Sequence, residues 1–271
     1  MALKTDVKDR VPLYPGRVKM TPVSGQANTY DMVRADQPTQ EGTPINKALF
    51  DKKADALVED ATVYVTKSGN DTTGDGTSAK PYLTIQAALN SVPKNLGGHL
   101  ANIHIGAGTY AGAVNVEYFT NGRVNLTGNA GAAVTIQGMV TVRAAVVNVE
   151  NIALTISNSY IYVTECGWFN LASPATLTCS GADHAVYARF GSHVCLGNNV
   201  TANNTKSSAF RCGENSTMYL FETSGSGNTV GMNAQAGTIW YRVNNMTATT
   251  DYATAYGGRV FSGAQTLLPK Y

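Results

Sequence analysis

Six short segments of the chain repeat one pattern, an apolar residue, a polar or aromatic residue and a second apolar residue in succession. Their last residues are Leu126, Val149, Leu171, Leu196, Leu220 and Tyr241. The steps between these positions are 23, 22, 25, 24 and 21 residues. A strand–turn pattern with a period in the low twenties is typical of a solenoid. No helical segments separate the strands, which argues against βαβ units and leucine-rich repeats. We predict an all-β fold, a single-stranded right-handed parallel β-helix of about seven turns.

The alternation within each segment predicts which side chains point into the β-helix. One inward column contains Val124, Val147, Phe169, Val194, Met218 and Ile239, and a second contains the six last residues named above. The outward column between them contains Asn125, Asn148, Asn170, Cys195, Tyr219 and Trp240. A further strand aligns in the later turns, with Ile161, Val186, Phe210 and Gly231 inward. Its outward residues are Tyr162, Tyr187, Arg211 and Met232.

The charge distribution places a domain boundary near residue 60. Residues 1–60 contain 18 charged residues, whereas residues 61–271 contain 20. Within residues 1–60 we expect extended chain and then a helix from Thr43-Pro44 to about Leu57. This helix is either a linker packed on its own body or a short trimeric neck. We assign 61–110 to the N-terminal cap and first turn, with a capping helix at 83–92, 111–250 to the β-helix body, and 251–271 to a C-terminal cap or tip.

Composition excludes several classes of protein. The net charge of +2 is too small for a nucleic-acid binder that works through bulk charge. No apolar run approaches the roughly 18 residues of a membrane span, and the first ten residues do not resemble a signal peptide. The four cysteines lack CxxC spacing, so we expect reduced core thiols, with a disulfide or metal set as the alternative. They are Cys166, Cys179, Cys195 and Cys212.

Candidate catalytic chemistry is sparse. Glycoside hydrolysis needs two carboxylates roughly 5 to 9.5 Å apart. The turn alignment puts Glu165 and Glu214 in one column, two turns and about 9.6 Å apart, with Phe190 between them. They are therefore weak catalytic candidates, and the alternative is two solvated surface acids. An active site between subunits also remains open. Asp71, Thr73 and Asp75 faintly resemble a calcium loop, but Tyr82 stands at its twelfth position. We expect no metal and no cofactor.

The outward aromatic residues are the stronger site candidates. Tyr162, Tyr187 and Arg211 are expected on adjacent turns, as are Tyr219 and Trp240. Exposed aromatic patches on a stiff scaffold usually mark a contact surface. The two columns lie on different strands and need not share a role. Each is a candidate for a subunit interface, for contact with a glycan, or for ordinary surface.

Two stretches of the chain resemble known proteins. The opening of the body resembles that of pectin-lyase-like β-helix proteins, including tail spikes and tail fibres of bacteriophages and phage-tail-like particles. The residues that carry this resemblance are Val63–Val65, Gly69, Asp71, Gly76-Thr77, Lys80–Ala88 and Ile103–Tyr110. The first region resembles N-terminal attachment segments of tail and prophage proteins from Gram-positive hosts. Its matching residues are Tyr14–Val18, Asp31–Asp36 and Glu41–Lys47.

The resemblance implies a homotrimeric tail fibre within a virion or phage-tail-like particle, assembled in the bacterial cytoplasm. Residues 1–60 would attach to a baseplate or tail protein, and the β-helix would bind a host-surface glycan, with no nucleic acid and no membrane insertion. A polysaccharide-degrading spike, using Glu165 and Glu214 or a pair between subunits, is the first alternative. A purely structural connector is the second. We expect binding rather than catalysis.

Overall fold

The structure is a computed structural model that describes residues 11–12, 18–34, 38–40, 56–129, 132–172, 174–197 and 199–262. The chain divides into two units, Met1–Ala54 and Asp55–Tyr271. In the first unit, β1 (Val11–Pro12) pairs antiparallel with β4 (Pro38–Gln40), and β2 (Val18–Pro22) pairs antiparallel with β3 (Tyr30–Arg34). Every side chain of β2 is exposed, in keeping with the small core expected of this region. The helix predicted from Thr43 to about Leu57 lies outside the described residues except for its last two positions, which are not helical: Ala56 forms a parallel β-bridge with Asn95.

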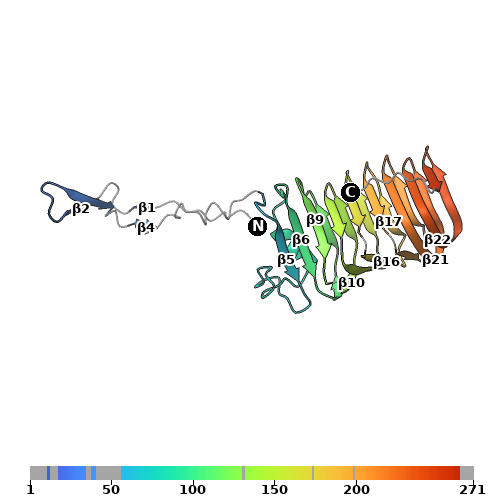
Figure 1. The fold of residues 1–271 in the computed structure, drawn as a ribbon, viewed down its shortest axis with the longest axis horizontal. Helices are drawn as coiled ribbons and strands as arrows, with labels where there is room; N and C mark the ends of the chain where they lie inside the picture. The colour runs from blue at the N-terminus through green and yellow to red at the C-terminus, as the bar shows by residue number, and fades with distance from the viewer. Residues whose placement is uncertain are drawn as a thin grey trace. The chain divides into compact units, whose positions relative to one another are not determined.

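The second unit is a parallel β-helix of about seven turns, as predicted, and helix accounts for about 3% of the residues that the structure describes. Successive turns lie side by side along one axis (Figure 1) and form three parallel sheets. The first sheet contains β5 (Ala61–Val65), β6 (Leu100–Ile105), β9 (Arg123–Thr127), β12 (Val146–Val149), β15 (Trp168–Leu171), β18 (His193–Leu196), the starts of β21 (Thr217–Gln235) and β22 (Thr238–Ala255), and β23 (Arg259–Ser262).

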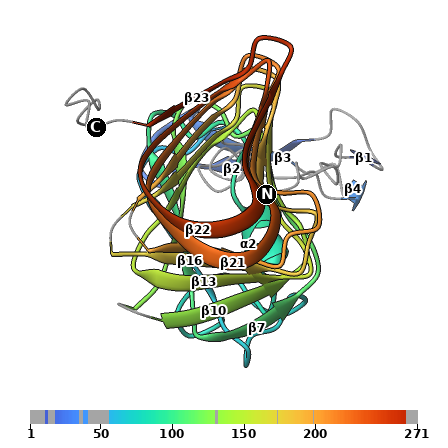
Figure 2. The same cartoon turned by 90° about the vertical axis from the view of Figure 1, so that its right-hand side faces the viewer.

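The other two sheets complete each turn. The second sheet contains β7 (Gly108–Ala111), β10 (Ala132–Gln137), β13 (Ile152–Ser157), β16 (Thr176–Ser180), β19 (Val200–Asn203) and the middle of β21 and β22. Figure 2, which looks along the body, shows β7, β10, β13 and β16 one behind another. The third sheet contains β8 (Val114–Glu117), β11 (Val140–Arg143), β14 (Ile161–Thr164), β17 (His184–Ala188), β20 (Ser208–Gly213) and the ends of β21 and β22.

The inward columns of the first sheet are confirmed. Val147 pairs in register with Val124 on one side and with Phe169 on the other. Phe169 in turn pairs with Val194, and all four side chains are fully buried. The second column is also buried as far as Leu220, and Tyr241 is partly buried against the core. Side chains more than twenty residues apart in sequence therefore stack directly inside the body.

The alignment of the third sheet is confirmed up to Arg211 and wrong by one residue in the next turn. Phe210 pairs with Met232, and Arg211 pairs with Asn233. Met232 therefore points inward and is fully buried, whereas we had placed it outward. Gly231 is buried as well, so two adjacent buried residues conceal the alternation at this point. An added Cβ at Gly231 would lie 2.7 Å from the carbonyl oxygen of Asp251, which explains why glycine is needed there.

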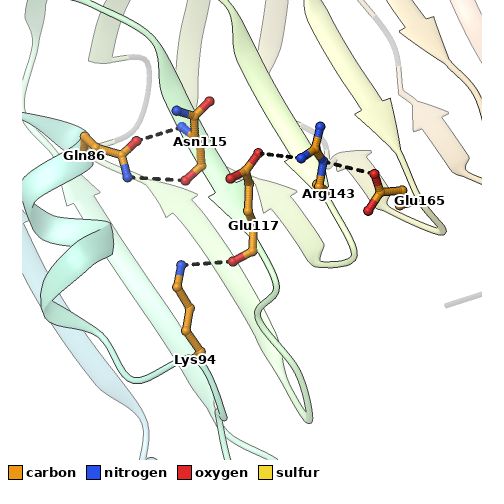
Figure 3. A network of polar contacts seen from close by, with 6 residues as sticks. All are labelled: Gln86, Lys94, Asn115, Glu117, Arg143 and Glu165. Atoms are coloured by element: carbon orange, nitrogen blue, oxygen red, sulfur yellow. Dashed lines mark hydrogen bonds and ion pairs between the residues drawn. The ribbon is translucent and has the colours of Figure 1, made fainter. Parts of the chain in front are cut away.

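The predicted N-terminal cap is α2 (Ile85–Ser91), which buries Ile85, Ala88 and Leu89. The side chain of Thr84 caps the helix by accepting a hydrogen bond from the backbone N–H of Ala87. Gln86 holds the helix to β8, because its amide exchanges two hydrogen bonds with the backbone of Asn115 (Figure 3). The helix thereby covers the first open end of the core.

The C-terminal end differs from the expectation of a cap or tip over residues 251–271. The repeat continues through β23, whose Val260 pairs with Ile239; residues 263–271 lie outside the described residues. Two tyrosines close the interior of the last turn. The rings of Tyr241 and Tyr252 stack with centroids 5.7 Å apart, and their hydroxyl oxygens lie 2.6 Å apart. Tyrosine suits this position because its ring covers apolar core while its hydroxyl group faces a polar partner.

The corner between the third and first sheets is built from residues with left-handed backbone. These residues include Ala144, Glu165, Phe190, Glu214 and Ala236, with φ between 38° and 55°. Backbone hydrogen bonds join the corners of successive turns, for example from the N–H of Cys166 to the carbonyl of Phe190. The corner is therefore a continuation of the hydrogen-bonded ladder, and it fixes where the side chains of its residues lie.

Candidate binding surface on the third sheet

The outer face of the third sheet brings three of the predicted site residues together. Tyr162 pairs with Tyr187, and Tyr187 pairs with Arg211, so the three lie on successive turns of one sheet. All three are partly exposed. Because adjacent parallel strands lie about 4.8 Å apart, their side chains form a continuous stack along the body. The outward alternation read from the sequence is thus confirmed for this column.

Two further residues extend this stack into what we call the Tyr–Arg cluster, which consists of Tyr160, Tyr162, Tyr187, Arg189 and Arg211. The ring centroids of Tyr162 and Tyr187 are 5.5 Å apart, and those of Tyr160 and Tyr162 are 6.3 Å apart. The guanidinium carbon of Arg211 lies 4.7 Å from the centroid of the Tyr187 ring, and that of Arg189 lies 5.9 Å from it. The Tyr187 ring therefore lies between another aromatic ring and two cations, an arrangement that favours stacking and cation–π attraction.

Hydrogen bonds hold the two arginines in different ways. Arg211 donates from Nη2 to the side-chain oxygen of Gln235 at 2.7 Å, whereas Arg189 donates from Nη2 to a carboxylate oxygen of Glu214 at 3.3 Å. The charge of Arg189 is thus compensated by an ion pair. Among the residues that the structure describes, no carboxylate forms an ion pair with Arg211.

His184 is buried beneath the Tyr–Arg cluster and packs against two of its tyrosine rings. It is 7% exposed, and its Nδ1 lies 3.1 Å from the carbonyl oxygen and 3.0 Å from the hydroxyl oxygen of Ser208. Its ring contacts those of Tyr160 and Tyr187, with centroids 5.8 and 5.2 Å away. Burial lowers the pKa of His184, and the charge of Arg211 lowers it further, against the opposing effects of the Ser208 bond and Asp183. The imidazole is therefore neutral at pH 7.

Unpaired polar atoms concentrate on this sheet. Throughout the described part of the chain, the buried side-chain nitrogen and oxygen atoms without a hydrogen-bond partner all lie on the outer face of the third sheet or directly after one of its strands. They are Thr141 Oγ1, Arg189 Nε, Arg211 Nε and Asn233 Oδ1, together with Arg143 Nε, which forms an ion pair with Glu165 at 3.4 Å but no hydrogen bond. Buried polar atoms without a hydrogen bond are rare in native structures, so their concentration on one face is a notable feature of this sheet.

The two weak catalytic candidates lie at the corner beside this sheet, and each faces an arginine. Glu165 Oε1 is 3.4 Å from Nε of Arg143, and Nη1 of the same arginine is 3.8 Å from Oε1 of Glu117 (Figure 3). Glu214 is paired with Arg189, as described above. Phe190 occupies the intervening corner, and the guanidinium group of Arg189 lies 3.9 Å from the centroid of its ring. Each glutamate thus neutralises a cation on the surface.

In the other predicted column, on the first sheet, the residue type changes from asparagine in the early turns to aromatic in the last turns. Tyr219 pairs with Trp240, as predicted, and Trp240 stacks on Phe261 with centroids 4.2 Å apart and planes inclined by 19°. Earlier in the column, Asn170 donates to Asn148 at 2.7 Å, and Asn125 donates to Asn102 at 2.8 Å. Within this column the aromatic residues are therefore confined to the last turns, whereas a neighbouring outward column places Trp168 against His193 in earlier turns, with ring centroids 5.3 Å apart.

Several residues of the site were missed in the sequence. Arg189 could have been found, because the alternation that places Tyr187 outward also places the residue two positions later outward. Tyr160 and His184 lie at or before strand starts, where turn geometry rather than alternation sets the direction of a side chain. Phe261 was missed because we placed it in a tip outside the repeat.

The residues that we considered for metal binding or redox chemistry have structural roles or are buried. Asp71 accepts hydrogen bonds from the backbone N–H groups of Leu83 and Thr84 and from the Thr84 hydroxyl group, so its carboxylate orders the start of α2. No group of three potential metal ligands is found among the described residues. The four cysteines are free thiols. Burial raises the pKa values of Cys179 and Cys212 to about 12.

The fold and this surface define a parallel β-helix protein with an aromatic and cationic ladder on one outer face. Comparisons with protein-family models, with curated proteins and with solved structures found no match. In the part of the chain that the structure describes, no helix has the length and apolar character needed to cross a membrane.

Proposed function

We propose that this chain is a receptor-binding tail fibre of a phage or phage-tail-like particle. In this proposal three copies form a homotrimer, residues 1–60 attach to a baseplate or tail protein, and the β-helix binds a glycan on the host surface. The sequence resemblances of the N-terminal region and of the β-helix opening support this assignment. A stiff β-helix also suits a fibre, because it can present a binding surface across successive turns. The separate unit at residues 1–54 could then serve for attachment.

The observation that carries the proposal is the stack of Tyr162, Tyr187 and Arg211 on successive turns. Sugars offer apolar C–H faces that lie on tyrosine rings, and arginine donates hydrogen bonds to their hydroxyl groups. The β-sheet holds these side chains at a fixed spacing, which lowers the entropic cost of binding. Three copies on one rigid assembly would raise the overall avidity without stronger contacts at each site.

Binding without cleavage is the form of the function that we propose. A glycosidase needs one carboxylic acid and one carboxylate placed on either side of the scissile bond. Glu165 and Glu214 are each paired with an arginine, and Phe190 lies in the turn between them.

The experiment uses the full-length chain and purified envelope polysaccharides from a panel of bacteria. Binding is measured by biolayer interferometry, and cleavage is measured by the appearance of new reducing ends. We expect binding to at least one polysaccharide without new reducing ends. New reducing ends would replace the proposal with a degrading spike, and the absence of both would leave a structural connector. Light scattering gives the mass of the assembly, and a monomer would overturn the fibre assignment.

The matched variants are Tyr187→Ala and Thr155→Ala. Tyr187 lies in the Tyr–Arg cluster, whereas Thr155 is a partly exposed residue of the second sheet in register with Thr135 and Thr178. We expect the first substitution to weaken binding and the second to leave it unchanged. Circular dichroism and thermal melting of each variant confirm that the β-helix is intact. Equal binding by both variants would place the glycan elsewhere on the body.

A further inference from the structure

We infer that the Tyr–Arg cluster recognises an acidic glycan, one that carries a carboxylate or phosphate group, with Arg211 as the residue that binds the anion. This inference rests on the proposed function, because it specifies the chemical class of the glycan. It is carried by the charges of the cluster, by the unpaired donor on Arg211 and by a polar hollow beside Tyr160.

The charges of the cluster leave one cation without a counterion. Glu214 neutralises Arg189, and His184 is neutral at pH 7. Asp183, the residue before His184, is exposed and forms no ion pair among the described residues. Among the described residues, the side-chain hydrogen bond of Arg211 is to the neutral amide of Gln235, and its other partner is the uncharged ring of Tyr187. An oxyanion on a ligand would supply the missing charge at this position.

The position of Arg211 is fixed before any ligand arrives. Its guanidinium group lies over the Tyr187 ring and donates to Gln235, so two contacts from different turns define its plane. Its Nε is buried and has no hydrogen-bond partner. A guanidinium group binds carboxylate or phosphate through two parallel donors, which requires a fixed plane and free donors. A ligand oxyanion that displaces the atoms now covering Nε would accept a hydrogen bond from this donor.

A hollow next to the cluster has the polarity of a sugar-binding surface. It is lined by Gln137, Gly138, Ser157, Asn158 and Ser159, and so by amides, hydroxyl groups and backbone. Ser159 directly precedes Tyr160, whose ring contacts Tyr162. The hollow, the tyrosine rings and Arg211 therefore follow one another along the body. Two turns, or about 10 Å, separate the strand of Tyr162 from that of Arg211, so the surface spans more than one sugar unit.

The test measures binding of the full-length protein to matched pairs of probes by isothermal titration calorimetry. One pair is oligogalacturonate and its methyl ester, which share a backbone and differ in charge. The second pair is phosphorylated dextran and dextran. We expect the acidic member of at least one pair to bind more tightly, and its advantage to shrink as salt is raised. The pair that shows the advantage identifies the oxyanion as carboxylate or phosphate.

Two arginine variants assign the effect to one residue. Arg211→Gln should lose the preference for the acidic probe, with binding about tenfold weaker. Arg242→Gln is the control, because Arg242 is an exposed residue that directly follows the inward-facing Tyr241 on a different face. It should retain the preference. Thermal melting of both variants establishes that the fold is unchanged.

The outcomes separate this inference from the proposed function. Equal binding of the acidic and neutral members of both pairs, alongside binding of an envelope polysaccharide, would overturn the acidic-glycan inference and leave the proposed function in place. Failure to bind any envelope polysaccharide or probe would overturn both. A change in the mass of the assembly caused by Arg211→Gln, without a change in binding, would assign this face to contact between copies and also overturn the inference.

Discussion

Val146 and Val147 provide a direct test of how the chain is wound. The two residues are adjacent in sequence and identical in type, but Val147 is fully buried and Val146 is 38% exposed. Val147 stacks between Val124 and Phe169 inside the body, whereas Val146 pairs with Trp168 on the outer face. Substituting each with alanine therefore makes the same chemical change on opposite sides of one strand.

The expected losses follow from burial. Val147→Ala removes two buried methyl groups, and at about 0.8 kcal/mol each the lost transfer free energy is roughly 1.6 kcal/mol. Hydrogen-bonded strands on both sides limit how far Val124 and Phe169 can move into the space. A cavity term therefore adds to the loss, and we expect the free energy of unfolding to fall by about 2–3 kcal/mol. For Val146→Ala we expect a loss of about 0.5 kcal/mol, as for an ordinary surface substitution.

The assay is urea unfolding of both variants and the wild type at one chain concentration. Circular dichroism and tryptophan fluorescence monitor the unfolding. Holding the concentration fixed matters because assembly would change the apparent stability. The slope with urea should be unchanged, since the surface exposed on unfolding is nearly the same. Equal losses for the two variants, or a larger loss for Val146→Ala, would refute the assignment of inward and outward faces.

Three further predictions concern individual side chains. When the native protein is treated with iodoacetamide at pH 8, we expect exposed Cys166 to react. Cys179 and Cys212 should react only after unfolding, because burial raises their pKa values to about 12. Mass spectrometry of peptides identifies the modified cysteines. The pKa of His184 is lower in the folded than in the unfolded chain, so its contribution to stability is complete above pH 6.5 and is lost as the pH falls through the folded pKa; melting temperatures measured against pH should fall less steeply in His184→Gln. Asp71→Ala removes the acceptor for two backbone donors before α2 and should cost about 1 kcal/mol in urea unfolding, and an unchanged stability would contradict the role given to this carboxylate.

The architecture could be predicted from the sequence because the inward positions obey a strict chemical rule. Inward positions such as Val124 and Phe169 stack on buried apolar side chains of neighbouring turns, so apolar residues recur at a nearly constant step. The rule fails where it is masked locally. Gly231 and Met232 are both buried, and glycine at the first of these is required by the close approach of a backbone carbonyl oxygen. The alternation there carries no information about direction.

The candidate site could be predicted only in part, and for a related reason. Alternation within strands placed Tyr162, Tyr187 and Arg211 on one face. It gave no information on pairing between side chains, which depends on geometry across turns. The ion pairs of Glu165 and Glu214 with arginines, and the uncompensated charge of Arg211, depend on contacts between residues some 22 to 25 positions apart. The reach and rotation of long side chains decide these contacts, and the order of residues does not record them.

The left-handed corner between the third and first sheets limits how this molecule can change in length. Each corner is short, and the backbone of one is bonded to the next, for example between Cys166 and Phe190. The corner itself accepts single residues, because it holds two residues between β11 and β12, three between β14 and β15 and four between β17 and β18, while the strands that follow stay in register. The number of stacked strands, and with it the length of the body, changes only by whole turns at this corner. Duplication or deletion of one entire coil is the change that preserves it, and it would lengthen or shorten the molecule by one strand spacing while leaving every remaining layer in its present surroundings.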